Sequence, residues 1–256
     1  MFASSQIAPS RSTASAVSEL LVNEVDCDMR RVAIPRPEIH LVVRFGPATR
    51  SGLDVSALGV REKAHRKLIR SGQRTVMARL QLGAHVAVLG VPASVLAGQV
   101  VALEDLWGDA AARRLCDQLA AVSGTAQAAV ILERAIAERA ASARIRSDGT
   151  QLALASAALL ASTSVSSVAS ELGVSERHLR RVFRETLGVS PKTFSKLTRF
   201  QRALSVARKN GRTNWANIAA ASGYYDQAHL IAEFRTLSGV TPQTLLEELR
   251  AQAFES

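Results

Sequence analysis

Two short stretches in the C-terminal half decide the fold: residues 168–174 read VASELGV, and residues 218–224 read IAAASGY, at an offset of 50. Further along, residues 183–191 read FRETLGVSP and residues 234–242 read FRTLSGVTP, at an offset of 51. Two matches in the same order indicate an internal repeat. The change in offset places one extra residue between the glycine and the second helix of the later copy.

Each copy of the repeat has the order helix, tight turn, helix. Gly173 and Gly223 fall at the turn, where a positive φ costs little only for glycine. Ser175 and Asp226 follow and are suited to cap the second helix. Each second helix is followed by a glycine and then a proline that suits the start of the next helix: Gly188 with Pro191, and Gly239 with Pro242. The pattern predicts two helix-turn-helix units.

The second helix of the first unit has one apolar and one basic side. Its apolar side is formed by Leu179, Val182, Phe183 and Leu187. The basic side has the spacing i, i+3, i+4, i+7 and carries Arg177, Arg180, Arg181 and Arg184. A recognition helix presents such a face to the major groove, where arginine bonds guanine edges or phosphates. We expect the first three arginines to contact bases and the fourth to contact the backbone, although a basic stripe can also be merely solvated.

The second helix of the second unit is much less charged. Its apolar side carries Leu230, Phe234 and Leu237, and its outward side carries Gln227, Ala228, Ile231, Ala232 and Arg235. Gln227 suits an adenine edge, and Ile231 suits a thymine methyl group. We therefore predict DNA contacts from this face as well, with less sequence discrimination than in the first unit.

Residues from Lys192 to about Lys209 predict one long helix between the units, and we expect Lys196 and Arg199 on it to contact DNA. A helix of this length spans about 26 Å, close to the roughly 34 Å of one DNA turn. From Ser175 to Arg212 the chain has eleven Lys and Arg residues and two acids, a net charge of +9. DNA binding that depends on these charges should weaken strongly as salt rises.

These motifs resemble the AraC/XylS family of transcription regulators over residues 148–250. The later copy has Gly223-Tyr224, Asp226-Gln227, Phe234-Arg235 and Thr241-Pro242, and the earlier copy from Leu172 to Phe183 is also typical. The resemblance implies two helix-turn-helix subdomains joined by a long helix. It implies base contacts from the first three arginines of the basic side and from Gln227, Ala228, Ile231 and Ala232. It also implies packing roles for His178 and His229, and Leu245 departs from the aromatic residue usual in the family.

With strands expected in its N-terminal half, the whole chain is predicted to be an α+β protein. We expect three parts: a flexible tail over 1–18, a β-rich regulatory or dimerisation domain with C-terminal helices over 19–147, and the DNA-binding domain over 148–256. Residues 40–45 and 76–82 are rich in β-branched or alternating apolar side chains and predict strands. Residues 83–97 are ambiguous, and helices are expected near 109–122 and 125–141. This half resembles, more loosely, the cupin-like half-barrel of some AraC-like regulators.

Several features of the N-terminal half leave alternatives open. The basic stretch from Arg61 to Arg79 predicts a solvated loop, an anionic effector site or an extra DNA contact. The apolar face of the helix expected over 125–141 is interpreted either as packing in the core or as a homodimer interface. His40, His65 and His85 lack the spacing of a cupin metal site, so we expect no metal and no cofactor.

The formal charge of +10 and the apolar content of 47% predict a folded chain with a polyanionic partner. With no catalytic motif, no secretion signal and no membrane-length apolar run, we expect a cytoplasmic protein that is not an enzyme. The expected partners are double-stranded DNA, RNA polymerase, a second copy of the chain and a small-molecule effector. The leading hypothesis is a sequence-specific transcription regulator, and family habit favours an activator. The alternatives are a non-specific architectural DNA-binding protein and an enzyme fused to a DNA-binding tail, whose reactive thiol would be Cys27 or Cys116.

Overall fold

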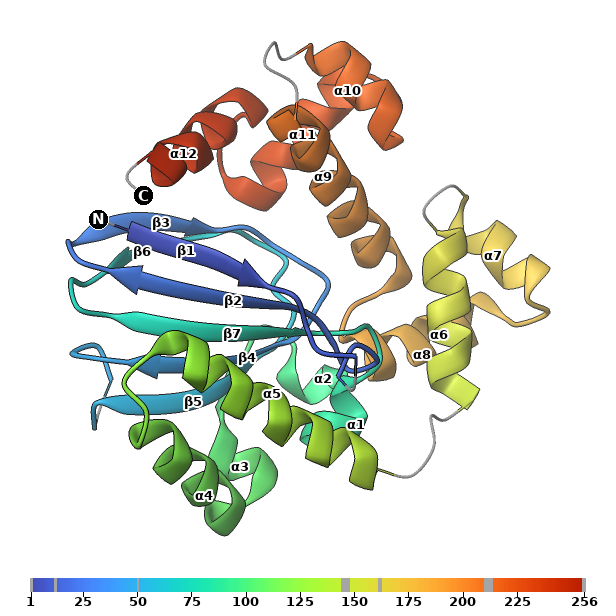
Figure 1. The fold of residues 1–256 in the computed structure, drawn as a ribbon. Coiled ribbons are helices and arrows are strands. Elements are labelled where there is room, and N and C mark those ends of the chain that lie inside the picture. Colours follow the sequence, from blue (N-terminus) through green and yellow to red (C-terminus); the bar gives the residue numbers. More distant parts are fainter. Residues whose placement is uncertain are drawn as a thin grey trace.

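The structure is a computed structural model that describes residues 2–11, 13–49, 51–143, 148–160, 163–209 and 214–254. A β-rich N-terminal domain lies beside a helical C-terminal domain (Figure 1), which confirms the α+β class. The domain boundary predicted after residue 147 lies outside the described residues, since 144–147 are not included. Within the described ranges, no helix is long and apolar enough to cross a membrane.

The N-terminal domain contains two antiparallel sheets. Its six-stranded sheet has the order β1 (Phe2–Ile7), β2 (Val17–Val25), β7 (Arg74–Leu80), β4 (His40–Phe45), β5 (Leu53–Leu58) and β8 (Val100–Ala102). The two-stranded sheet pairs β3 (Met29–Ala33) with β6 (His65–Ile69). Alternate side chains of the central strands, among them Leu41, Val43 and Val76, are fully buried, as the period of two in a strand requires. The strands predicted near residues 40–45 and 76–82 are therefore present.

Helices cover the buried face of the large sheet (Figure 1). The ambiguous residues 83–97 form two short helices, α1 (His85–Leu89) and α2 (Ala93–Leu96). After β8 come α3 (Leu103–Trp107), α4 (Asp109–Ala120) and α5 (Thr125–Ser142). Helix α5 packs on β2, β7 and α1, and its apolar residues Ala129, Leu132 and Ile136 are buried there. Of the two alternatives for this helix, the structure favours the core helix, because the face considered for a dimer is covered by the sheet.

Two segments differ from the expectations for the N-terminal half. The flexible tail expected at the start instead contains β1, which pairs with β2 from Phe2–Val25 to Ile7–Leu20. A Ser-rich segment shows no apolar pattern, but backbone hydrogen bonds to an edge strand do not require one. The basic stretch from Arg61 to Arg79 is not a loop either, since it contains β6 and most of β7.

In the part of the C-terminal domain that the structure describes, all regular elements are helices. It contains α6 (Asp148–Leu159), α7 (Val165–Glu171), α8 (Glu176–Leu187), α9 (Pro191–Lys209), α10 (Trp215–Ser222), α11 (Gln227–Ser238) and α12 (Pro242–Phe254). Phe183, Phe200 and Phe234 are fully buried in it, and the Phe200 and Phe234 rings lie 4.5 Å apart. Leu245, the departure from the family pattern, is also fully buried. Helix α9 runs between the α7–α8 pair and the α10–α11 pair (Figure 1), as the sequence predicts.

Candidate nucleic-acid interface

The first helix-turn-helix unit consists of α7, a tight turn and α8. Gly173 has φ +65° at the turn, and the Val174 N–H donates to the Ala169 carbonyl at 2.9 Å. The Ser175 hydroxyl then caps α8 by accepting from the His178 N–H at 3.2 Å. These bonds satisfy backbone groups that a sharp turn between two helices would otherwise leave unpaired. The turn therefore fixes where the first residues of α8 lie.

The second unit repeats this construction with α10 and α11. Gly223 has φ +82°, and the Tyr224 N–H donates to the Ala219 carbonyl at 3.0 Å. The Asp226 carboxylate caps α11 by accepting from the His229 N–H at 2.7 Å. The repeat seen in the sequence is thus a repeat of backbone geometry, with the same turn hydrogen bond and the same cap hydrogen bond in both units.

The four arginines of α8 lie on its solvent-facing side. Arg177, Arg180, Arg181 and Arg184 are all exposed, while Leu179 and Phe183 on the opposite side are fully buried. Two of the arginines have partners within the helix. Arg180 donates to the Glu176 carboxylate one turn earlier, and Arg181 lies 3.1 Å from Nδ1 of His178. Exposed pairs of this kind contribute little to stability, so both guanidinium groups can exchange these partners for an external anion.

Helix α11 exposes the weakly charged face expected from its sequence. Gln227, Ala228, Ala232 and Arg235 are exposed. Ile231 is only half-buried and packs against the core, which limits how far it can reach towards a base. The face therefore has one hydrogen-bonding residue near its start and one cation near its end.

The two cations expected on α9 behave differently from each other. Lys196 is half-buried and Arg199 is held within the protein. Arg199 Nη2 lies 2.8 Å from Glu233 Oε2, and its guanidinium carbon lies 5.1 Å from the centre of the Tyr224 ring. Arg199 was expected to contact DNA, but in this structure it fastens the long helix to the turn and second helix of the second unit.

Glu233 is a residue of the second unit that the sequence reading missed. It is buried, with only 5% of its side chain exposed, and one of its oxygens has no partner among the described residues. The sequence does contain a signal for this buried acid. One stripe at helical spacing is formed by residues 230, 233, 234 and 237, and an acid on an otherwise apolar stripe needs a cation as partner. Burial, followed by the Glu233 charge, raises the pKa of the neighbouring Tyr224 well above its usual value.

The two histidines of the recognition helices have packing and backbone roles. Each donates its backbone N–H to the cap of its helix. The His229 ring also packs edge-on against Tyr224, with the ring centres 5.4 Å apart. His178 is half-buried and adjoins Arg181.

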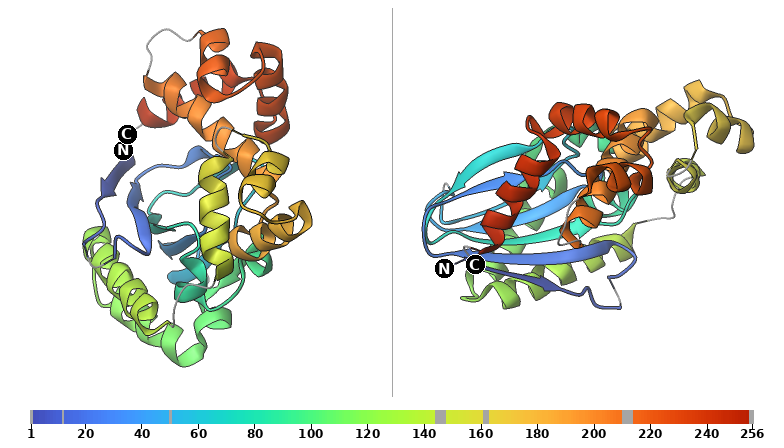
Figure 2. Two further views of the ribbon diagram at one scale, coloured as in Figure 1. Left: turned by 90° about the vertical axis from the view of Figure 1, so that its right-hand side faces the viewer. Right: turned by 90° about the horizontal axis from the view of Figure 1, so that it is seen from above.

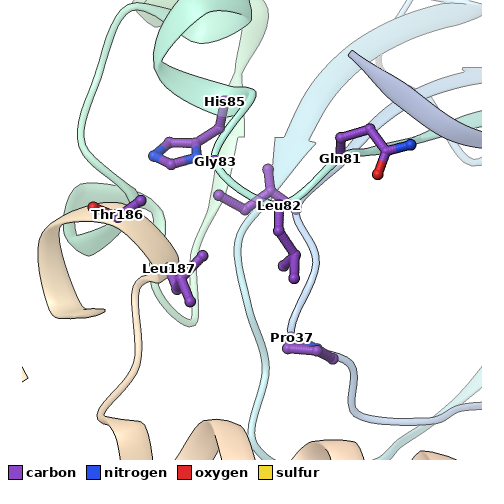
Figure 3. A pocket seen from close by; sticks show the side chains of 8 residues that line it. Pro37, Gln81, Leu82, Gly83, His85, Thr186 and Leu187 are labelled. Carbon is purple, nitrogen blue, oxygen red and sulfur yellow. The ribbon is translucent and has the colours of Figure 1, made fainter. Parts of the chain in front are cut away.

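The helical C-terminal domain is docked on the N-terminal domain at both helix-turn-helix units (Figure 2). At the first unit, Thr186 and Leu187 at the end of α8 line a small cleft with Gly83 and His85 (Figure 3). Burial lowers the pKa of His85 to about 4, so this ring is neutral at the contact.

At the second unit, the Ala64 N–H donates to the Leu237 carbonyl at 2.7 Å. Arg66 donates to the Ser238 carbonyl and pairs with Glu248, each at 2.9 Å. Both docking points use the C-terminal ends of α8 and α11, which leaves their N-terminal turns free.

A cavity of about 600 Å³ lies between the residues after β3 and helix α9. Four basic residues line it, and no acid does: Arg36, Arg202, Arg208 and Lys209. Burial lowers the pKa of Arg36 and of Arg208, and Glu38 and Glu19 are the acids whose charge acts on Arg36. Gln201 donates to the Pro35 carbonyl at the edge of this cavity.

Two capped helix-turn-helix units joined by one long helix define a class of DNA-binding domain. Residues 168–248 match the family described as a helix-turn-helix domain. Residues 168–248 of this chain therefore form a helix-turn-helix domain, as the motifs predict. No curated protein is similar to the chain in sequence at a significant level.

Three solved structures are similar to this chain at low sequence identity. The apo form of a ToxT variant from Vibrio cholerae has 13% identity and a TM-score of 0.45, over 90% of this chain and 97% of that one. Wild-type ToxT from Vibrio cholerae bound to an unsaturated fatty acid has 13% identity and a TM-score of 0.43, over 89% and 94%. The AraC-like transcriptional activator CuxR has 13% identity and a TM-score of 0.27, over 76% and 78%.

Proposed function

We propose that this chain is a sequence-specific transcription regulator that reads two successive major-groove segments of one DNA duplex, and that it acts as an activator. The observation that carries the proposal is the exposed row of four arginines on α8, three of which lie in the first half of this capped helix. Residues 148–256 form the DNA-binding domain, and residues 19–147 form the regulatory domain.

The chemistry of the row supports base reading more than general attraction. Arg177, Arg180 and Arg181 lie in the first turns of α8, the part of a recognition helix that contacts base edges. A guanidinium group can bond O6 and N7 of one guanine at once. Arg184 lies two turns from the start of α8, where a phosphate contact is expected. The apolar side of α8 is buried, so the helix can present no other face to DNA.

The second unit adds a weaker reading surface. Arg199, which the sequence places among the DNA contacts, supports this surface indirectly. Its pairing with Glu233 fixes α11 against α9. Helix α9 has 19 residues, about 28 Å at 1.5 Å per residue, so it holds the units roughly one DNA turn apart. One chain can then occupy two successive segments without a second copy.

Selection of bound duplexes from a random pool by the full chain, followed by footprinting, tests this proposal. We expect a motif with two half-sites about one helical turn apart, with guanine in the half-site that α8 contacts. Binding should weaken steeply with salt, as phosphate neutralisation requires. Tight binding with no enriched motif would instead support an architectural protein and would refute sequence-specific regulation.

The regulatory domain is proposed to respond to a small anionic molecule. The 600 Å³ cavity beside α9 has the size of an ordinary ligand site, and its four cations favour a carboxylate or phosphate group. A ligand there would contact the helix that joins both units.

Thermal unfolding of the full chain with a series of monocarboxylates and with inorganic phosphate tests the site. A rise in melting temperature that Arg208→Gln abolishes supports it. Stabilisation by an acid that survives both Arg208→Gln and Arg36→Gln would place the ligand elsewhere.

A further inference from the structure

The extra residue of the second repeat is Tyr225. Val174 and Tyr224 make the same backbone hydrogen bond, to Ala169 and Ala219, at 2.9 and 3.0 Å. In the first unit the next residue is already the helix cap, Ser175. In the second unit Tyr225 stands between Tyr224 and the cap Asp226. The offset change from 50 to 51 is therefore the insertion of this one tyrosine.

The folded chain buries almost none of the Tyr225 side chain. It is 93% exposed, whereas Tyr224, one residue earlier, is 5% exposed and packs against Arg199 and His229. A turn of this kind closes without the extra residue, as the first unit demonstrates. An aromatic ring held in water at this point gains little from burial, so both the ring and its hydroxyl are available to a binding partner.

The position of Tyr225 relates it to the reading face of α11. Gln227 and Ala228, the first exposed residues of that helix, follow it within three positions. The α8 face has four arginines, of which Arg184 is placed to contact a phosphate, but the exposed face of α11 has only Arg235, at its far end. The start of α11 therefore has no cation of its own to fix it against the DNA backbone, and the Asp226 carboxylate there is engaged as the cap.

We propose that the Tyr225 hydroxyl donates a hydrogen bond to a phosphate oxygen at the edge of the groove that α11 enters. Tyrosine is among the side chains that contact phosphates and so set the register of a protein on its duplex. The inference rests on the proposed DNA-binding function and adds the residue that anchors the second recognition helix. A phosphate contact carries no base information, so its loss weakens binding to all duplexes alike.

The test compares Tyr225→Phe and Tyr225→Ala with the unaltered full chain, on a selected duplex and on a random duplex. Val130→Ala, which shortens another exposed apolar side chain far from α11, is the matched control. We expect both tyrosine variants to bind each duplex about 5–10-fold more weakly, the size of one hydrogen bond, and the control to bind normally.

Normal binding by Tyr225→Phe would overturn the inference, whether or not Tyr225→Ala is impaired. A loss confined to the selected duplex would also overturn it, because that result indicates base contact by the ring. If the unaltered chain binds no duplex, the proposed function itself fails, and the two failures are thus distinguishable.

Discussion

The pairing of Arg199 with Glu233 makes a sharp stability prediction. Replacing Arg199 with methionine leaves the buried Glu233 carboxylate without its arginine, with only the His229 ring 3.9 Å away, and removes the contact with the Tyr224 ring. Breaking a buried pair in this way costs about 3–5 kcal/mol. Because the Arg199 side chain is 24% exposed, water relieves part of this cost. We expect the free energy of unfolding to fall by about 2–4 kcal/mol.

The double variant Arg199→Met with Glu233→Leu provides the control within the same site. With both charges replaced by apolar groups, no unpaired charge remains buried, and we expect recovery to within about 1 kcal/mol of the unaltered chain. Urea unfolding followed by tryptophan fluorescence measures both, since Trp215 lies 6.0 Å from Phe234 beside the pair. A double variant as unstable as the sum of its single variants would refute the coupling, and with it the account of how α11 is fastened.

Three further predictions follow from the recognition helices and the domain contact. Arg180→Ala should reduce the preference for a selected over a random duplex more than Gln227→Ala does, and the reverse order in competition binding would show that the second unit is the main reader. Because of His85, lowering the pH from 6.5 to about 4 should reduce the free energy of unfolding by up to about 1.4 kcal/mol for each pH unit. The pKa of His85 is lowered to about 4 in the folded chain, so the unfolded chain takes up the proton first; His85→Gln should flatten this part of a urea-midpoint series. Gly188→Ala should destabilise the chain more than Gly173→Ala, because both have positive φ but only a Cβ at Gly188 meets the Ala93 carbonyl, at 2.9 Å; equal thermal shifts would count against tight docking of α8 on the N-terminal domain.

The C-terminal domain was well predicted because its signals are local. The signals are a glycine at the turn, a cap before each recognition helix and an apolar stripe, and each acts within a few residues. Both copies of the repeat carry them. The exposed side of α8 follows directly from the spacing of its buried residues. The same reasoning gave the extra residue of the second unit, though not that its side chain would be so exposed.

The sequence is less informative where the position of a residue depends on a distant partner. Helical spacing could place Arg199 on α9, but could not show that its partner is Glu233, 34 positions away. Strand β1 forms because β2 offers a free edge, and its own Ser-rich sequence carries no sign of this. A basic stretch such as the one around Arg66 is usually solvated, but Arg66 donates to the Ser238 carbonyl at the end of α11 and pairs with Glu248 of α12.

The central claim is that the arginine row of α8 reads DNA. The most direct measurement is the affinity ratio between a selected and a random duplex for the full chain with Arg177, Arg180 and Arg181 all changed to alanine. Arg113→Ala with Arg114→Ala, which removes two exposed charges from α4, controls for most of the three-charge change in net charge. The account predicts that the triple variant loses roughly 100-fold or more of its preference, at about 1–3 kcal/mol for each base contact, while the control keeps it. A triple variant that keeps its preference would contradict the account.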